Sequence, residues 1–258
     1  MRHVVLAFVA FGFGLALAGP ESPPARPATA TAPTAPRGLA KAGVFVDPVK
    51  KEIALKGQVV FRGPDILEYF CCSRGTAEHE SLISAEADPM ALRVALMLPP
   101  FRLQPGKPVR WDEDLQPPNG PTILVFLEYQ DPKTGKTVRD RAEDWVLMAE
   151  KDPKTGKMAR RPMRKTGFVF SGGGFYVDPE TREQTFLASG DGALITLYHR
   201  VSSVLDNPQK EGSGDEIWYA NTDVVPPIGT KVTVVLQPAA PPASQPTSRP
   251  ASTPANPR

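Results

Sequence analysis

The chain has 258 residues, of which 41% are hydrophobic and 22% are charged. This is enough for one good-sized hydrophobic core or two small ones, and it excludes a wholly disordered chain. Thirty Lys and Arg residues nearly balance 28 Asp and Glu residues, so the net charge of +2 predicts no strong field for binding nucleic acid or an acidic membrane surface. Two cysteines exclude a disulfide scaffold, an all-thiolate zinc site and a four-thiolate iron–sulfur cluster within one chain.

The N-terminus has the features of a secretory signal peptide. Arg2 supplies positive charge, residues 4–17 form an apolar stretch broken only by glycines, and Ala16-Leu17-Ala18 fits the small-x-small cleavage pattern. We predict a signal peptide over residues 1–18, cleavage near Ala18-Gly19, and a periplasmic or extracellular mature chain without a transmembrane span. The alternative is an uncleaved anchor, but a span needs about 20 apolar residues and this run is shorter.

Proline marks the limits of the folded domain. Residues 19–37 contain six of the 30 prolines and residues 238–258 contain seven, mixed with Ala, Ser and Thr. Such segments cannot bury enough apolar surface to offset the entropy of ordering the backbone. We therefore predict a disordered linker over 19–37, a globular domain over 38–237 and a disordered tail over 238–258.

Asp-Pro pairs divide the domain into short segments. Asp suits the first position of a type I turn and Pro fixes the backbone angle of the second, so most of these pairs predict hairpin loops. Runs of strand length and strand composition flank them at 122–129, 168–170 and 231–236. Ser189-Gly-Asp-Gly192 also resembles a tight hairpin turn. The pairs are Asp47-Pro48, Asp88-Pro89, Asp131-Pro132, Asp152-Pro153 and Asp178-Pro179.

One helix is expected, at about 88–98. Asp88 is a good N-cap, Pro89 fits the first helical position, and Pro99-Pro100 ends the run of helix formers. The interior is apolar on all sides except at Arg93, so the helix should be largely buried against a sheet. Arg93 either extends to solvent along its apolar stem or meets a carboxylate beneath the helix. The expected fold is α+β, mainly antiparallel β of sandwich or barrel type with this one buried helix.

The chemically richest segment precedes the helix, over 66–83. In a strand over 66–72, Glu68 shares a face with Cys72, whereas Cys71 points to the other side. Adjacent cysteines on a strand point apart, so we predict two free thiols or only a labile bond, with buried apolar filling as their ordinary role. If the next segment is extended, Glu78 and Glu80 share a side and His79 points away from them.

These residues resemble the core of the YdjY-domain family of exported bacterial proteins. Leu67-Glu-Tyr-Phe-Cys-Cys72 followed by Gly75-Thr-Ala-Glu-His-Glu-Ser81 matches its pattern, and further blocks follow in order to cover about 45–237. The resemblance brings little indication of function with it. Where relatives carry a helix histidine this chain has Arg93, and where they carry a tryptophan it has Phe168. The family pattern would gather His, Cys, His and Glu in one pocket, and a permanent cation at position 93 would weaken a metal site there. The further blocks are 103–109, 143–146, 171–179 and 226–235.

Three functions remain open on these residues. The leading one is a non-enzymatic extracytoplasmic module that binds an unknown ligand or envelope protein through the 68–81 segment and the helix with Arg93. Its rival is a metal-binding protein, or a metal- or thiol-dependent enzyme, in which one transition ion such as Zn²⁺ is bound or Cys72 acts as a nucleophile paired with His79. The third is a structural envelope protein with an exposed apolar face. The candidate patch comprises Glu68, Cys72, Glu78, His79, Glu80 and Arg93, and the candidate metal ligands are His79, Glu80, Cys72 and Glu68.

Overall fold

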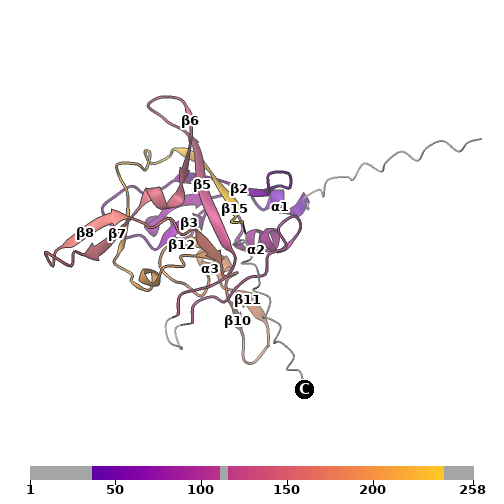
Figure 1. Ribbon diagram of the computed structural model, residues 1–258. Coiled ribbons are helices and arrows are strands. Elements are labelled where there is room, and N and C mark those ends of the chain that lie inside the picture. Colours follow the sequence, from indigo (N-terminus) through magenta and orange to yellow (C-terminus); the bar gives the residue numbers. More distant parts are fainter. Residues whose placement is uncertain (1–36, 111–115, 241–258) are drawn as a thin grey trace, which may run out of the picture. The chain divides into compact units, whose positions relative to one another are not determined.

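The computed structural model describes residues 37–110 and 116–240. The expected signal peptide and almost all of the two proline-rich segments lie outside these residues. Ten of the described strands form one large sheet (Figure 1). They are β1 (Val44–Asp47), β2 (Glu52–Val59), β3 (Tyr69–Ser73), β4 (Ser81–Ala85), β5 (Thr122–Gln130), β6 (Thr137–Arg141), β9 (Phe168–Phe170), β12 (Ala193–Thr196), β13 (Leu205–Asp206) and β15 (Lys231–Pro238).

Smaller elements surround this sheet. Strands β10 (Phe175–Val177) and β11 (Gln184–Phe186) form a separate hairpin, and β14 (Trp218–Ala220), β7 (Val146–Lys151) and β8 (Met158–Pro162) form a three-stranded sheet in that order. The α-helices of the described part are α1 (Arg37–Lys41), α2 (Pro89–Met97) and α3 (Ala188–Asp191). The short 3₁₀ helices are η1 (Glu78–Glu80), η2 (Ala142–Trp145) and η3 (Lys210–Ser213).

The large sheet closes on itself through β2. This strand pairs along its length with β15, and its last residues also pair with β4. The ring therefore runs β2-β15-β5-β9-β13-β12-β3-β4 and back to β2. Of its contacts only β3–β4 and β12–β13 are parallel. The expected α+β class with a mainly antiparallel, barrel-like sheet is thus confirmed. Gly57 allows the closure, because a Cβ there would lie 2.7 Å from the carbonyl oxygen of Ser84.

Side-chain alternation places the core inside the ring. On β5 the side chains of Ile123, Val125 and Leu127 are fully buried, and their neighbours are half-buried. This period of two is the pattern of a strand with one face toward the core. Helix α2 covers part of the assembly as predicted: the Asp88 carboxylate accepts the Ala91 N–H at 2.7 Å, and Leu92 lies on the buried face.

Four Asp-Pro pairs form hairpin loops, and the fifth begins α2. In the loop after β7, for example, Asp152 accepts backbone N–H groups from Lys154 and Thr155 at 2.8 and 2.9 Å. The turn predicted at 189–192 is wrong, because α3 occupies it. The flanking strands β11 and β12 pair in different sheets, so a helical turn connects them.

Within residues 37–110 and 116–240, no helix combines the length and the apolar character needed to cross a bilayer.

Candidate functional site

Backbone pairing gathers three segments around Glu68. The Glu68 N–H donates to the Glu80 carbonyl at 3.1 Å, which brings η1 against the entry to β3. The Glu68 carbonyl accepts the N–H groups of Leu197 and Tyr198 at 2.8 and 3.1 Å. The chain just after β12 therefore runs beside Glu68 and carries Arg200 to it.

Three carboxylates surround the Arg200 guanidinium. Its Nη2 atom bonds the Glu68 carboxylate and lies 3.9 Å from Glu80 Oε1, and its Nη1 atom lies 4.0 Å from Asp191 Oδ2. The guanidinium also packs 4.7 Å from the ring centroid of Tyr69. Each of these four charged side chains is between 23% and 30% exposed, so solvent screens the group only in part. We call Glu68, Glu80, Asp191 and Arg200 the carboxylate cluster.

The electrostatics of the carboxylate cluster are unbalanced. Burial raises the pKa of Glu80, and the nearby negative charge of Glu68 raises it further. Burial is the largest effect on Arg200 and opposes its charge, but the hydrogen bond to Glu68 and the charges of Tyr69, Glu68 and Glu80 together outweigh it, so the pKa of Arg200 is raised. Burial, followed by the charge of Asp191, raises the pKa of Tyr69. Three acids facing one permanent cation leave an excess of negative charge when all the acids are ionised.

A cavity opens beside the carboxylate cluster. Its volume is about 380 Å³, and Asp191 and Arg200 form part of its wall. Asp191 is held in place because its carboxylate accepts the Ser202 hydroxyl at 2.5 Å and the Ala193 N–H at 3.1 Å. The wall of the cavity thus presents the Asp191 carboxylate next to the apolar and aromatic side chains of Leu187, Val201 and Tyr198. Its lining residues are Leu187, Asp191, Tyr198, Arg200, Val201 and Ser202.

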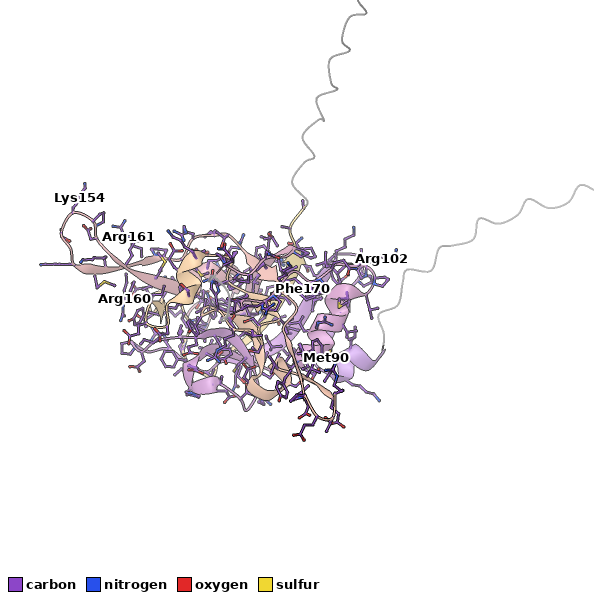
Figure 2. The ribbon with its side chains drawn as sticks, turned by 90° about the horizontal axis from the view of Figure 1, so that it is seen from below. Met90, Arg102, Lys154, Arg160, Arg161 and Phe170 are labelled. Carbon is purple, nitrogen blue, oxygen red and sulfur yellow. The ribbon has the colours of Figure 1, made fainter. Side chains whose placement is uncertain are left out.

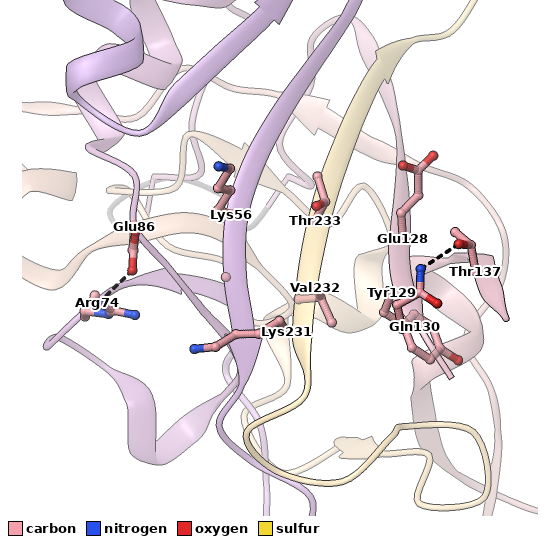
Figure 3. Close-up of a pocket in the computed structure, with 11 residues that line it drawn as sticks. Lys56, Arg74, Glu86, Glu128, Tyr129, Gln130, Thr137, Lys231, Val232 and Thr233 are labelled. Atoms are coloured by element: carbon pink, nitrogen blue, oxygen red, sulfur yellow. Dashed lines mark hydrogen bonds and ion pairs between the residues drawn. The ribbon is translucent and has the colours of Figure 1, made fainter. Parts of the chain in front are cut away.

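A larger cavity of about 490 Å³ lies over the outer face of β2, β15 and β5 (Figure 3). Like the smaller cavity, it is lined by none of the residues predicted as functional. On its wall Arg74 pairs with Glu86 at 2.7 Å and Glu128 pairs with Arg139 at 2.6 Å, whereas Lys56 packs on the Phe45 ring and Lys231 donates to Gln58. The carboxylate cluster is the stronger candidate, because it brings together Glu68 and Glu80, which were both predicted as functional.

Cys72 and Glu78 lie in a second, separate group. Both cysteines are free and fully buried, as expected for thiols that fill space in the core. Burial raises the pKa of Cys72, which disfavours a thiolate. Glu78 accepts the Ser84 hydroxyl at 2.5 Å and the Gly75 N–H at 3.0 Å, and these bonds lower its pKa.

The condition under which Glu78 and Glu80 would share a side is not met, because residues 78–80 are not extended but form the 3₁₀ helix η1. With three residues per turn, successive side chains point in three directions instead of alternating between two. Glu78 therefore turns toward Ser84, and Glu80 turns toward Arg200. His79 points to solvent with 79% of its side chain exposed, and its Nε2 atom lies 3.9 Å from Glu80.

Arg93 lies outside both groups, and among the described residues it forms no ion pair with a carboxylate; its side chain is half-buried. Its Nε donates to the Gly172 carbonyl at 2.8 Å, and its guanidinium lies 5.2 Å from the centroid of Phe175. The loop between β9 and β10 thus supplies the contacts of Arg93, and the carboxylate expected as one alternative beneath the helix is not its partner. Arg200, not Arg93, is the cation that faces Glu68 and Glu80.

The four predicted metal ligands do not form one site. Cys72 is fully buried, whereas His79 is largely exposed, and Glu68 and Glu80 face Arg200. No three His, Cys, Asp or Glu side chains in residues 37–110 and 116–240 are placed to hold a metal ion. This corrects the metal expectation from the sequence.

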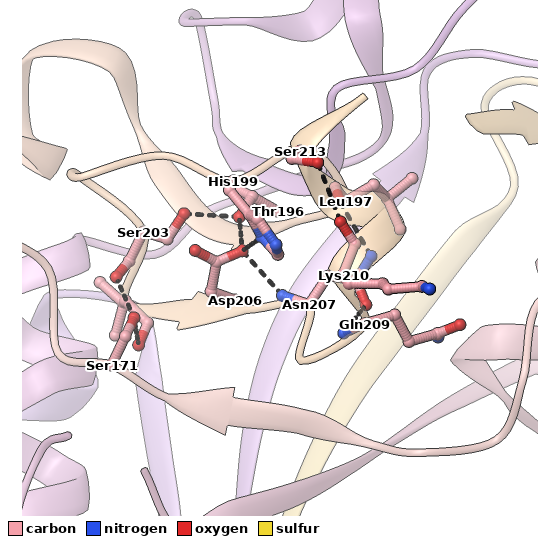
Figure 4. A network of polar contacts seen from close by, with 11 residues as sticks. Ser171, Thr196, Leu197, His199, Ser203, Asp206, Asn207, Gln209, Lys210 and Ser213 are labelled. Carbon is pink, nitrogen blue, oxygen red and sulfur yellow. Dashed lines mark hydrogen bonds and ion pairs between the residues drawn. The ribbon is translucent and has the colours of Figure 1, made fainter. Parts of the chain in front are cut away.

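A buried polar network next to Arg200 was not predicted (Figure 4). His199 Nδ1 lies 3.2 Å from Asp206 Oδ1, which also accepts the Thr196 hydroxyl at 3.0 Å. Thr196 in turn bonds Ser203 at 2.5 Å. All four side chains are fully buried or nearly so, and burial raises the pKa of Asp206. The network fixes the 196–206 segment and with it Arg200. In the sequence, His199, Arg200 and Asp206 follow the apolar run at 193–197, and this grouping could have indicated the network.

Comparison with known proteins bears on the whole domain. The family model described as the YdjY domain matches residues 44–237. No curated protein matches the chain, and no solved structure matches it either. The matched range extends from the first strand of the large sheet, β1, to the end of the closing strand β15. The chain therefore belongs to the YdjY domain family.

Proposed function

We propose that this domain is a non-enzymatic binding module that recognises a ligand with a positively charged group at the cavity beside the carboxylate cluster. The observation that carries the proposal is the arrangement of Glu68, Glu80 and Asp191 around Arg200, next to a cavity of about 380 Å³.

An ammonium or guanidinium group is the ligand chemistry that this site favours. The pKa of Glu80 is raised because this side chain is partly buried near Glu68. Its ionised form is therefore less stable than that of a solvated glutamate. A cation that enters the cavity would compensate the excess negative charge, and Asp191 already lines the wall. Tyr198 and Leu187 supply the apolar surface that a carbon chain or ring next to the charge would cover.

The properties of the reactive side chains support binding rather than catalysis. A cysteine nucleophile needs a thiolate and a base within reach, but the pKa of Cys72 is raised by burial and His79 points to solvent. His199 and Asp206 are within 3.2 Å of each other, yet both are buried. A substrate would have no direct access to them.

Export is part of the proposal. Arg2, the apolar residues 4–17 and the Ala16-Leu17-Ala18 cleavage pattern favour processing near Ala18-Gly19 and a periplasmic or extracellular protein. The ligand would then be a component of the cell envelope or its surroundings. Intact-mass measurement of the protein from cell fractions tests this, since the processed chain would begin at Gly19 and appear outside the cytoplasm.

Calorimetric titration with matched probes tests the ligand chemistry. We expect n-butylamine and 1,5-diaminopentane, which are cationic at pH 7, to bind the purified protein, and n-butanol not to bind. Asp191→Asn and Glu80→Gln should each weaken amine binding roughly fivefold, which corresponds to about 1 kcal/mol for a partly exposed ion pair. Glu183→Gln is the control, because Glu183 is exposed and outside the cavity. Equal binding of butanol and butylamine, or equal losses in the control and in Asp191→Asn, would contradict the proposal.

A further inference from the structure

Positive charge is concentrated in one segment of the chain. Residues 151–165, which we call the basic ribbon, contain seven Lys and Arg residues and one acid, Asp152. Subtracting these from the totals of 30 and 28 leaves 23 Lys and Arg against 27 Asp and Glu elsewhere. The basic ribbon therefore carries +6, whereas the rest of the chain carries −4. The near-neutral net charge conceals this separation.

The basic ribbon comprises the last residue of β7, the loop that follows it, β8 and the three residues after β8. Strand β8 pairs only with β7 and forms an edge of the three-stranded sheet. In Figure 2, Lys154 lies at the free end of this hairpin, with Arg160 and Arg161 along it. All seven basic residues are exposed.

The basic residues nearer the domain have partners, and the lysines of the outer loop do not. Among the described residues, Lys151, Lys154 and Lys157 form no ion pair. Arg160 packs 3.6 Å from the centroid of Tyr219. The remaining three form ion pairs: Arg161 with Glu150 at 2.6 Å, Arg164 with Glu211 at 2.5 Å and Lys165 with Asp144 at 2.8 Å. The outer end of the basic ribbon thus presents uncompensated positive charge.

An exposed apolar side chain lies among these lysines. Met158 is 64% exposed, follows Lys157 in the chain and lies directly opposite Lys151 across the hairpin. A flexible thioether flanked by lysines suits a boundary between charged headgroups and acyl chains.

We propose that the basic ribbon docks this protein on an anionic lipid membrane. Lys151, Lys154 and Lys157 contact lipid phosphates, and Met158 enters the interface between them. A lipid surface fits better than duplex nucleic acid, because three unpaired lysines fall short of the roughly six to ten phosphate contacts of a typical nucleic-acid binder, and Arg160 covers the nearby Tyr219 ring. This surface is distinct from the carboxylate cluster, whose charge is of the opposite sign.

The chain contains its own matched control. The hexamer Asp-Pro-Lys-Thr-Gly-Lys occurs at 152–157 in the basic ribbon and again at 131–136, in the loop between β5 and β6. Both copies form the same turn, in which the Asp carboxylate accepts the N–H of the residue two positions on at 2.8 Å. The copy at 131–136 is followed by Arg139, which pairs with Glu128 and Glu52. Removing the two lysines from either copy therefore removes the same charge from the same turn, and the effect on binding can be compared between the two loops.

Vesicle sedimentation at 0.15 M salt tests the proposal. The purified protein is mixed with vesicles of phosphatidylcholine alone or with 30% phosphatidylglycerol. We expect tighter binding to the anionic vesicles and a loss of that preference in 1 M salt. Each lysine near an anionic surface strengthens binding about fivefold, so Lys154→Ala/Lys157→Ala should weaken it roughly 25-fold and Lys133→Ala/Lys136→Ala by less than about twofold. Met158→Ser should weaken binding about tenfold through lost apolar contact.

Three results would overturn the proposal. Equal losses in the two double variants would mean that total charge, not the basic ribbon, drives binding. Equal binding of the wild type to neutral and anionic vesicles would exclude phosphate recognition. Tighter binding to a short DNA duplex than to the anionic vesicles, with no effect of Met158→Ser, would assign the basic ribbon to nucleic acid instead.

Discussion

At the scale of single residues, burial decides what the reactive groups of this protein can do. Cys71 and Cys72 are adjacent on β3, and both are fully buried and unpaired. Burial raises the pKa of each thiol, and their mutual proximity adds to the effect at Cys71. The same residue type at an exposed site beside a cation would be reactive.

We therefore expect both thiols to be unreactive in the folded protein. Ellman's reagent at pH 8 should label two thiols in guanidinium chloride, and the native protein at least about a thousand times more slowly. The thiols must first be exposed by unfolding, which costs at least about 5 kcal/mol in a typical domain. The exposed form is then populated less than about one part in a thousand, and the labelling rate falls in proportion. Rapid labelling of one thiol in the native protein would contradict the assigned burial and reopen the case for a cysteine nucleophile.

At the scale of elements, one turn of 3₁₀ helix gives two glutamates opposite environments. Glu78 accepts two hydrogen bonds, from Ser84 and the Gly75 N–H, which lower its pKa. Glu80 is partly buried near Glu68, which raises its pKa. The difference arises because residues two apart in η1 do not share a side, as they would in a strand.

The two glutamates should therefore affect stability with opposite pH dependence. An unfolded glutamate titrates near pH 4.3. The raised pKa of Glu80 means that its stabilising contribution is present below about pH 4.3 and is lost as the pH rises through the folded value. The lowered pKa of Glu78 means that its contribution is present above about pH 4.3 and is lost as the pH falls through the folded value.

Urea unfolding between pH 3 and 7 measures this difference. As the pH rises, the wild type should lose stability relative to Glu80→Gln and gain stability relative to Glu78→Gln. Each variant serves as the control for the other, because both remove one carboxylate from the same helical turn. Parallel pH profiles for the two variants would show that the assigned environments are wrong.

At the scale of the whole molecule, the last strand closes the barrel. Strand β15 pairs with β2 over 231–236 and with β5 over 232–238, so two neighbours depend on it for their hydrogen bonds. Val234 and Leu236 on this strand are fully buried. The ring therefore joins strands from opposite ends of the domain.

Truncation at two places tests this dependence. A chain that ends at Ala240 should unfold in urea with the free energy of the full chain, because β15 is complete. A chain that ends at Thr230 lacks β15 and should show no cooperative transition, since it exposes a core face and two strand edges. Cooperative unfolding of the shorter chain would mean that the closed ring is not required for stability.

Local patterns in the sequence were sufficient for some of the elements, but not for α3 or η1. Asp88 and Pro89 begin α2 as predicted, the alternation over 122–129 produces β5, and the Asp-Pro pairs form hairpin loops. These features depend on backbone preferences and on side-chain period, which act within a few residues. The family blocks were also legible in the sequence, and the YdjY domain model matches 44–237.

The candidate site depended on contacts between distant segments. Arg200 reaches Glu68 across 132 positions, and Arg93 is satisfied by a carbonyl 79 positions away. The short helix η1 separated Glu78 from Glu80, and neither the period of a strand nor composition indicates such a turn. The sequence by itself thus determined the class of fold and the elements with a clear local pattern, such as α2 and β5, because local forces select them. Only the tertiary structure decided which charges meet, because the closing of the ring sets those distances.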